Sequence, residues 1–429
     1  MSEEEGAQVP LLPQPITSDS KAWKAYWEAQ GQLWRTEPEI DAKRQKELDD
    51  RRKIVPDIKQ AIYPFSEMKL SRADVEWLLA THQDGRGPVV WDEEKDRPEY
   101  ERRTGLDLRG ADLSKVNLAY LPLTCLRGAL HRRNEWPRTT LEQRDAAAIH
   151  LEKSNLYQTH LEDASLARAH LKGAFAFEVH MEYADLFEAH LEGINLTVGC
   201  LCGASLRRAF FDGASILLNV SLGDEQKGFA RLAGVHWGES DLSNIPWNQL
   251  TMLGDEVIAR DRLDFNGKIK DDTKQLEDFK TSVRANRRLA TALRNQGLNE
   301  EADYFAYCAQ KLQRVVFQRQ RKFGRYLFSE FLDLLAGYGY KPWRSFMAYL
   351  IVIIGFAASY YVIGQIVGPH LSPVGSVVFS MTSFHGRGFF PGGIKLDDPL
   401  TVLAAIEAFV GLLIEVTFIA TLTQRLFGK

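Results

Sequence analysis

Large apolar residues recur at every fifth position through the middle of the chain. An α-helix repeats every 3.6 residues and a strand every two, so a period of five fits neither element. Alanine stands two residues before many of these positions, as at Ala164, Ala184 and Ala204. A short repeat of fixed length predicts stacked units that contact only their neighbours. The apolar positions are Leu151, Leu156, Leu161, Leu166, Leu171, Met181, Leu186, Leu191, Leu196, Leu201, Leu206, Phe211 and Ile216, interrupted at Ala176.

Helical patterns flank the repeats on both sides. Residues 21–35 place Trp23 and Trp27 on one face of a predicted helix, and Ser71 precedes a second helical pattern as a capping residue. After the repeats, two long amphipathic segments meet at Gly297, which is a suitable C-cap glycine. We therefore expect an N-terminal helical region over 21–105 and a helical-hairpin linker over 254–340.

Two long apolar segments near the C-terminus predict membrane spans. Residues 346–367 contain no charged side chain and would extend about 33 Å as a helix, enough to cross a bilayer core. Residues 400–427 are equally apolar but contain Glu407 and Glu415, which are costly in lipid and are expected to face a partner or a cavity. Basic residues precede the first span and follow the second, so both chain ends are expected in the cytoplasm.

Composition adds little to this picture. The net charge of −4 favours no class of partner, and residues 1–20 are acidic, contain proline and are expected to be disordered, without a signal peptide. The four cysteines are scattered, which fits a reducing compartment. Cys200 and Cys202 form a C-x-C pair without a second pair, so we assign no metal site and no cofactor.

The five-residue pattern resembles the pentapeptide-repeat family, in which the repeat reads A-(D/N)-L-x-x. The segment GADLSKVNL at 110–118 matches it, and Leu232, Trp237 and Leu242 continue the spacing. The resemblance implies a right-handed quadrilateral β-helix over 106–253, in which four pentapeptides form one coil and the central residues point inward. Residues 124–147 and 217–229 would be insertions.

The C-terminal segments resemble the two-helix pore module of potassium-channel-like proteins. Between the spans lies SVVFSMTSF, which is too short to cross a bilayer, followed by a loop with a Gly-x-Gly pattern. The resemblance implies a re-entrant segment over 374–392 within a pore domain over 341–429. Gly411 corresponds in kind to the hinge glycine of that family, and Glu407 and Glu415 would line or gate the pore. The implied selectivity filter comprises Phe384, His385, Gly386, Arg387, Gly388 and Phe389.

This loop departs from the family pattern T-V-G-Y-G-D. Phe384 replaces the threonine, Arg387 the tyrosine and Phe389 the aspartate. Arginines directed at a pore axis would repel potassium, whereas arginines turned away could pair with Glu407 or Asp397. The selectivity therefore stays open between an anion-permeable or poorly selective pore and an altered cation pore.

Histidines recur through the repeats at intervals of ten, directly before an inward position. Glutamate follows that position in all but one case, where Lys172 replaces it. Protonation of stacked histidines could make the repeats a pH sensor for the pore. Alternatively, outward positions accept any polar residue and a duplicated ten-residue unit copied its histidine. The residues are His150, His160, His170, His180 and His190.

Together these patterns predict a mixed fold: a quadrilateral β-helix, an α-helical hairpin and a two-helix transmembrane pore domain. We expect a multi-pass ion channel of a bacterial inner membrane, a homotetramer in the lipid bilayer that conducts inorganic ions. The alternative is a membrane-anchored scaffold with a non-conducting pore module, whose repeats bind a cytoplasmic protein.

A topoisomerase-binding DNA mimic is disfavoured because basic and acidic residues mix in the repeats, so no link to nucleic acid is expected. The chain contains no nucleotide-binding loop or nucleophile elbow, so we expect no enzyme.

Overall fold

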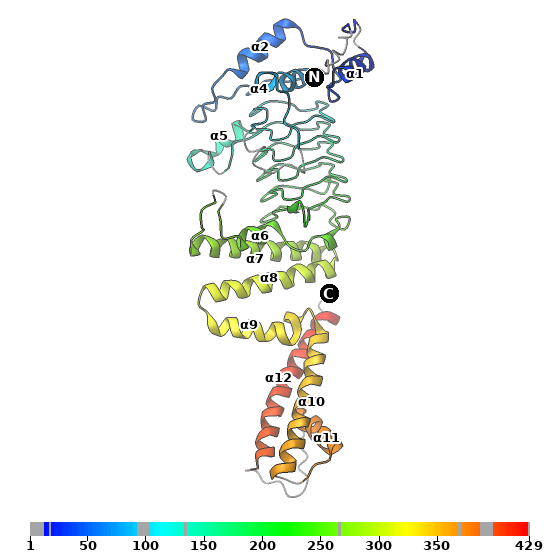
Figure 1. The fold of residues 1–429 in the computed structure, drawn as a ribbon, viewed down its shortest axis with the longest axis vertical. Helices are drawn as coiled ribbons and strands as arrows, with labels where there is room; N and C mark the ends of the chain where they lie inside the picture. The colour runs from blue at the N-terminus through cyan, green and yellow to red at the C-terminus, as the bar shows by residue number, and fades with distance from the viewer. Residues whose placement is uncertain are drawn as a thin grey trace, which may run out of the picture. The chain divides into compact units, whose positions relative to one another are not determined.

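The chain forms two compact units, Met1–Ala302 and Asp303–Lys429, in a computed structural model. The ribbon in Figure 1 traces both units. The structure describes residues 13–16, 19–91, 103–132, 135–264, 267–367, 370–386 and 398–427.

Short helices begin the first unit. Helix α3 starts with a capping box, because the Ser71 hydroxyl accepts a hydrogen bond from the amide of Asp74 and the Asp74 carboxylate accepts one from the amide of Ser71. Arg72 in this helix donates to the backbone carbonyls of Asn117 and Ala119, both at 3.1 Å, and so ties the helical region to the repeats. The helices are α1 (Ser20–Ala29), α2 (Ala42–Arg52), α3 (Arg72–Ala80) and α4 (His82–Gly85).

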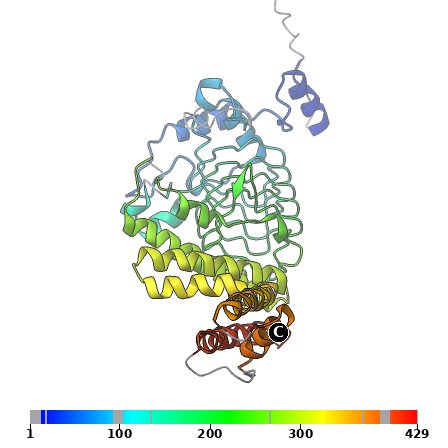
Figure 2. The same ribbon diagram turned by 60° about the horizontal axis from the view of Figure 1, so that its bottom comes forward.

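The repeats form layers of chain, which we call the repeat stack (residues 106–250); Figure 2 shows the layers. Parallel bridges join residues twenty apart, such as His150 with His170 and Asn155 with Phe175. The predicted inward positions are buried through most of the stack: Leu161 and Leu171 are both 0% exposed. Each layer therefore repeats the path of the layer before it, with apolar side chains inside.

The expected β-helix fold class is wrong. About 46% of the structure is helical, and the described residues contain just two strands, β1 (Gly223–Asp224) and β2 (Gly228–Phe229), paired antiparallel. In each pentapeptide a single bridging residue is followed by a turn, and turn residues such as Lys153 and Asp163 have φ of 56° and 54°. Because such left-handed residues follow a single bridging residue, the extended segments of these pentapeptides stay too short to form strands.

The repeat register shifts by one residue near the end of the series. Ile216 is 49% exposed, whereas Leu217 is 4% exposed and takes the inward place. The bridge partner of Asn195 is Ile216, twenty-one residues away rather than twenty. One additional residue in the turn after Phe211 causes the shift, so the prediction that Ile216 points inward is wrong.

Two insertions and a helical end complete the first unit. The first insertion holds η2 (Trp136–Arg138) and α5 (Leu141–Ala146), and the second holds the β1–β2 hairpin. The Gln296 side chain, just after α7, accepts from the amide of Leu242 at 2.8 Å and donates to the carbonyl of Ser240 at 2.7 Å. These bonds fix the end of α7 to the last layer. The remaining elements are η3 (Trp247–Gln249), α6 (Gly254–Arg260) and α7 (Asp272–Asn295).

The second unit is helical. Two buried clusters join its three C-terminal helices, one around Ile353, Phe384 and Ile414 and the other around Tyr360, Phe379 and Leu400. Two helices are long and apolar enough to cross a membrane, over Trp343–Ile366 and Pro399–Ala420. The elements are α8 (Asn299–Arg319), which begins at the end of the first unit, α9 (Phe323–Ala336), η4 (Gly337–Gly339), α10 (Pro342–Val367), α11 (Pro373–Phe384) and α12 (Pro399–Phe427).

Candidate pore segment

Helix α11 is a short apolar helix packed against both long helices. The Ser372 side chain caps its N-terminus and Pro373 occupies the first turn. Its twelve residues extend about 18 Å, well short of a bilayer core of about 30 Å. A serine stripe at helical spacing, Ser376, Ser380 and Ser383, is buried on its inner side at 1%, 0% and 2% exposure.

Glu407 of α12 is buried at the meeting point of the three helices. Its Oε2 accepts a hydrogen bond from the Tyr360 hydroxyl of α10 at 2.7 Å, and its Oε1 accepts one from the Ser380 hydroxyl of α11 at 2.5 Å. Glu407 is 0% exposed. Both carboxylate oxygens therefore have partners from the neighbouring helices, and the side chain joins α10, α11 and α12.

Gly411 lets α11 approach α12 closely. A Cβ added at Gly411 would clash with the backbone carbonyl oxygen of Phe384, and it would lie 3.1 Å from the Phe384 ring. Phe384 itself is 1% exposed. The contact gives Gly411 a packing role at the end of α11, in addition to the gating role that the sequence suggests.

The end of α11 carries the described part of the predicted filter. His385 caps the helix and Gly386 follows with φ of 65°. The His385 Nδ1 lies 2.8 Å from the Met381 carbonyl, to which it can only donate, and Nε2 lies 3.4 Å from Glu415 Oε1. With the proton on Nδ1, the contact with Glu415 becomes an ion pair only when the ring is doubly protonated.

Part of the sequence prediction falls elsewhere. Arg387, Gly388 and Phe389 lie outside the described residues, as does Asp397. The pairing of Arg387 with Glu407 or Asp397 stays a prediction.

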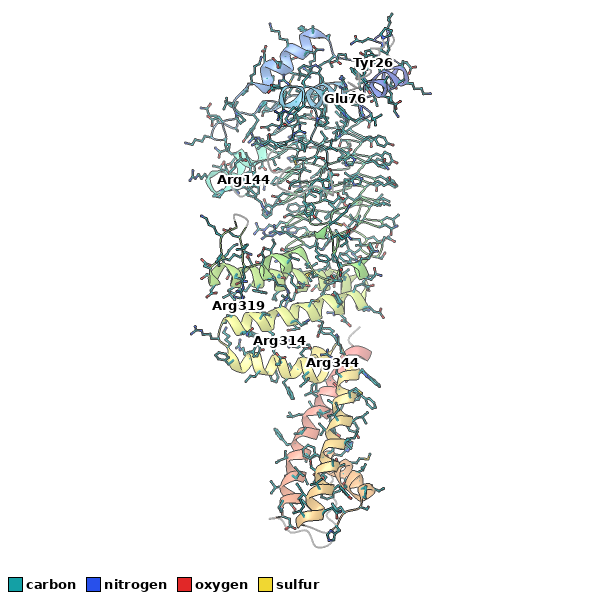
Figure 3. The ribbon with its side chains drawn as sticks, in the orientation of Figure 1. Tyr26, Glu76, Arg144, Arg314, Arg319 and Arg344 are labelled. Atoms are coloured by element: carbon teal, nitrogen blue, oxygen red, sulfur yellow. The ribbon has the colours of Figure 1, made fainter. Side chains whose placement is uncertain are left out.

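A buried aspartate, which sequence reasoning missed, connects α8, α9 and α10. Asp333 of α9 is 9% exposed and receives hydrogen bonds from Arg314 at 2.8 Å, Arg344 at 3.1 Å and Tyr307 at 3.1 Å. Arg314 and Arg344 are labelled in Figure 3. The hydrogen bonds fix the first turn of α10 against the two preceding helices. A lone acidic residue in the apolar segment FLDLLA was the available signal.

Apolar side chains cover the outside of this unit. Within the most apolar windows of α10 and α12, 17% and 22% of the residues are buried inside the structure, far less than expected for core helices of a soluble protein. Helix α9 adds an exposed apolar face. Its exposed residues are Phe323, Leu327, Phe328, Phe331 and Leu334.

The five repeat histidines fall in two columns. The rings of His150 and His170 stack with centroids 4.6 Å apart, and His190 follows at 5.4 Å. His160 and His180 stack at 4.7 Å in the second column. Burial and the neighbouring ring of His150 lower the pKa of His170, whereas the hydrogen bond with Glu182 raises the pKa of His180. The pKa values of His170 and His180 are therefore shifted in opposite directions.

Comparisons with known proteins find matches among solved structures. No family model matches the chain, and no curated protein sequence matches it. QnrB1, a plasmid-mediated fluoroquinolone resistance protein, is 12% identical with a TM-score of 0.15; the match covers 32% of this chain and 64% of that chain, less than two thirds of its length.

Two further structures are pentapeptide-repeat proteins. Rfr23 of the cyanobacterium Cyanothece 51142 is 22% identical over 29% of this chain and 87% of that one, with a TM-score of 0.12. HetL of Nostoc sp. strain PCC 7120 is 20% identical over 39% and 86%, with a TM-score of 0.13. TM-scores this low do not assign the chain to a family, and the resemblance of α10–α12 to a channel module stays a prediction.

Proposed function

We propose that this chain is the subunit of a membrane ion channel, with α10, α11 and α12 as its pore module and the repeat stack as a soluble domain. The supporting observation is the arrangement of a twelve-residue apolar helix packed between two helices long enough to span a bilayer. In lipid, irregular backbone occurs only where protein or water surrounds it. A short helix followed by a turn at membrane depth therefore favours a water-filled path over a simple anchor.

The exposed apolar surface supports placement in a bilayer. The side chains of Ile354 and Phe409 are 67% and 64% exposed on α10 and α12. In water such a surface would be an aggregation hazard, whereas acyl chains cover it without cost. The apolar face of α9 would lie at the membrane surface, as amphipathic helices do.

The end of α11 favours cations over anions. A helix C-terminus carries partial negative charge, and Glu415 lies beside it through its contact with His385. The described residues thus support a cation-permeable path.

Two spanning helices cannot enclose a pore by themselves, so the channel would be a homo-oligomer. The resemblance to potassium-channel-like proteins implies a tetramer. Basic residues before α10 and in its first turn, among them Arg319, Arg325 and Arg344, favour a cytoplasmic repeat stack and cytoplasmic chain ends in a bacterial inner membrane. The Asp333 hydrogen bonds would then transmit movement of α8 to α10.

A membrane-anchored scaffold is the second candidate. The observation in its favour is that Phe384, the first predicted filter residue, is 1% exposed and packed on Gly411. A module packed in this way is stable without conducting. The repeat stack would then bind a cytoplasmic protein partner.

Ion flux from the purified full chain in liposomes tests the proposal. Potassium and chloride flux would be measured separately, with protein-free liposomes as the blank. We expect potassium flux to exceed chloride flux, and Glu415→Gln to reduce that preference. Glu330→Gln, in α9 and 52% exposed, is the matched control and should leave it unchanged. Absence of flux of both ions would reject the channel and favour the scaffold.

A further inference from the structure

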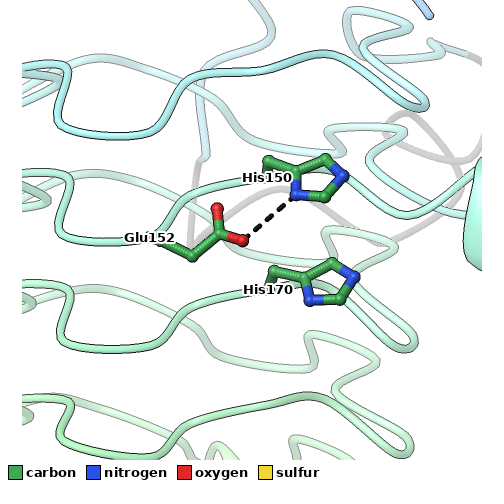
Figure 4. Close-up of side chains that lie close together, drawn as sticks. All are labelled: His150, Glu152 and His170. Atoms are coloured by element: carbon green, nitrogen blue, oxygen red, sulfur yellow. Dashed lines mark hydrogen bonds and ion pairs between the residues drawn. The ribbon is translucent and has the colours of Figure 1, made fainter. Parts of the chain in front are cut away.

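Two clusters of metal-ligating side chains lie on the repeat stack, and the proposed channel function uses neither. The first is His150, Glu152 and His170, and the second is His160, Glu162 and His180. In each triad, one ligand atom per residue lies within 4.8 Å of the others. Figure 4 shows the first triad, with the Glu152 carboxylate beside the imidazole rings of His150 and His170 from neighbouring layers.

The repeat geometry builds each triad. The glutamate follows the first histidine by two residues. The second histidine follows the first by twenty residues and pairs with it in a parallel bridge. The His150 and His170 rings are within 1° of parallel, and those of His160 and His180 within 5°. Each layer therefore presents its imidazole nitrogens to the same side as the layer before it, toward the glutamate.

The carboxylates are held ready for a cation. Glu152 Oε1 lies 3.1 Å from His150 Nδ1, and its Oε2 is buried without a hydrogen-bond partner. Glu162 Oε1 lies 2.7 Å from His160 Nδ1, while the Thr124 hydroxyl donates to Oε2 at 3.0 Å and orients the group. A buried carboxylate oxygen without a donor is costly, and a bound cation would relieve that cost.

We propose that each of these two His–Glu–His triads binds one divalent transition-metal ion, with zinc the ion that best matches two imidazoles and a carboxylate. Donor atoms around tetrahedral zinc lie about 3.3 Å apart, so small side-chain rotations bring the triads to ligand geometry. The outer histidines, His150 and His160, are 42% and 44% exposed in their side chains, which leaves room for water as the fourth ligand. The ion links two layers of the stack.

The next layers contain natural interruptions of the same pattern. Lys172 stands between His170 and His190, where the triads have glutamate, and forms an ion pair with Glu192 at 3.1 Å. In the second column Cys200 follows His180, and Glu182 is paired with Lys227 at 3.2 Å. The positively charged ammonium group of Lys172 or Lys227 repels a metal cation from these layers. The pattern therefore predicts which layers bind metal and which do not.

Zinc binding to the full chain tests the proposal. The chain would be purified in detergent without a polyhistidine tag, stripped with a chelator and dialysed against Zn²⁺, and bound zinc would be measured by mass spectrometry. We expect His150→Gln and His160→Gln each to remove about one ion per chain or to weaken one site by about 100-fold or more. His236→Gln is the control, because His236 stacks on Phe210 and has a glycine two residues later.

A gain-of-binding variant keeps the test independent of folding defects. Lys172→Glu, made in the His150→Gln background, offers a carboxylate to His170 and His190, and should restore about one bound zinc ion per chain. Native elution volume and circular dichroism would verify that each variant is folded. Equal zinc content in wild type, His150→Gln and His160→Gln, or no zinc on the wild type, would overturn the proposal. The zinc measurement does not depend on ion flux. Failure of the metal-site proposal can therefore be distinguished from failure of the channel proposal.

Discussion

The Tyr360 hydroxyl of α10 donates a hydrogen bond of 2.7 Å to Oε2 of Glu407 in α12. Both residues are 0% exposed, and the Ser380 hydroxyl of α11 binds the other carboxylate oxygen. This carboxylate therefore stabilises the packing of α10, α11 and α12. Glu407 is tolerated within a predicted span because two hydroxyl groups donate hydrogen bonds to its carboxylate. The carboxylate therefore does not contact lipid.

Tyr360→Phe should destabilise the second unit by about 1–3 kcal/mol, because it leaves a buried carboxylate oxygen without its donor. Tyr361→Phe is the matched control: Tyr361 is the next residue, 40% exposed, and should tolerate the change. The temperature at which the detergent-purified protein loses its native elution peak measures the effect. Equal temperatures for the two variants would contradict the role given to this pair.

Gly411→Ala should separate α11 from α12, because the added Cβ meets the Phe384 carbonyl. Overpacking of this kind costs about 1–3 kcal/mol. Gly355→Ala, in the middle of α10, meets nothing within 4 Å and should be neutral or slightly stabilising. We expect lower thermal stability and loss of any ion flux for Gly411→Ala alone. Wild-type behaviour of this variant would show that the close approach is not required.

Leu217→Ala should cost about 2–5 kcal/mol, because Leu217 fills the stack interior at 4% exposure. Ile216→Ala should change stability by no more than about 0.5 kcal/mol, because Ile216 is 49% exposed. Hydrogen exchange of the neighbouring layers, whose amides bond to this segment, measures the difference. If Ile216→Ala proved the more damaging variant, the register would be the unshifted one expected from sequence.

The Asp74 cluster should make the first unit sensitive to acid. Burial of Asp74 would raise the pKa of its carboxyl, but hydrogen bonds from Arg44 and Ser71 outweigh burial, and the pKa lies below its usual value. A group with a depressed pKa in the folded state stabilises the fold above its unfolded pKa of about 3.9. That contribution is lost as the pH falls through the folded pKa.

Asp74→Asn should therefore weaken α3 at neutral pH, and the difference from wild type should shrink below about pH 4. Hydrogen exchange of the α3 amides, compared between the two proteins at each pH, provides the measurement. Asp50→Asn is the control, since Asp50 is 61% exposed and its ion pair with Lys53 spans 3.5 Å. A difference that persisted unchanged into acid would rule out the charge of Asp74 as its source.

The sequence by itself determined which residues are apolar at a fixed period, and so most of the buried positions in the stack. Leu161 and Leu171 are buried as their spacing requires, because inward direction along a repeat is a local property of the chain. Length and high hydropathy likewise determined the two candidate spans over Trp343–Ile366 and Pro399–Ala420. These properties can be predicted without knowing which segments of the chain contact one another.

Only the tertiary structure decided the features that depend on contacts between distant residues. It replaced the expected strands with single bridges, because turn residues such as Lys153 adopt left-handed backbone, and it moved the inward position from Ile216 to Leu217. Glu407 meets Tyr360 forty-seven residues earlier, and His150 meets His170 across a layer. Sequence spacing identifies such residues as candidates for contact. The packing of helices and layers sets the distances between their charged and hydrogen-bonding groups.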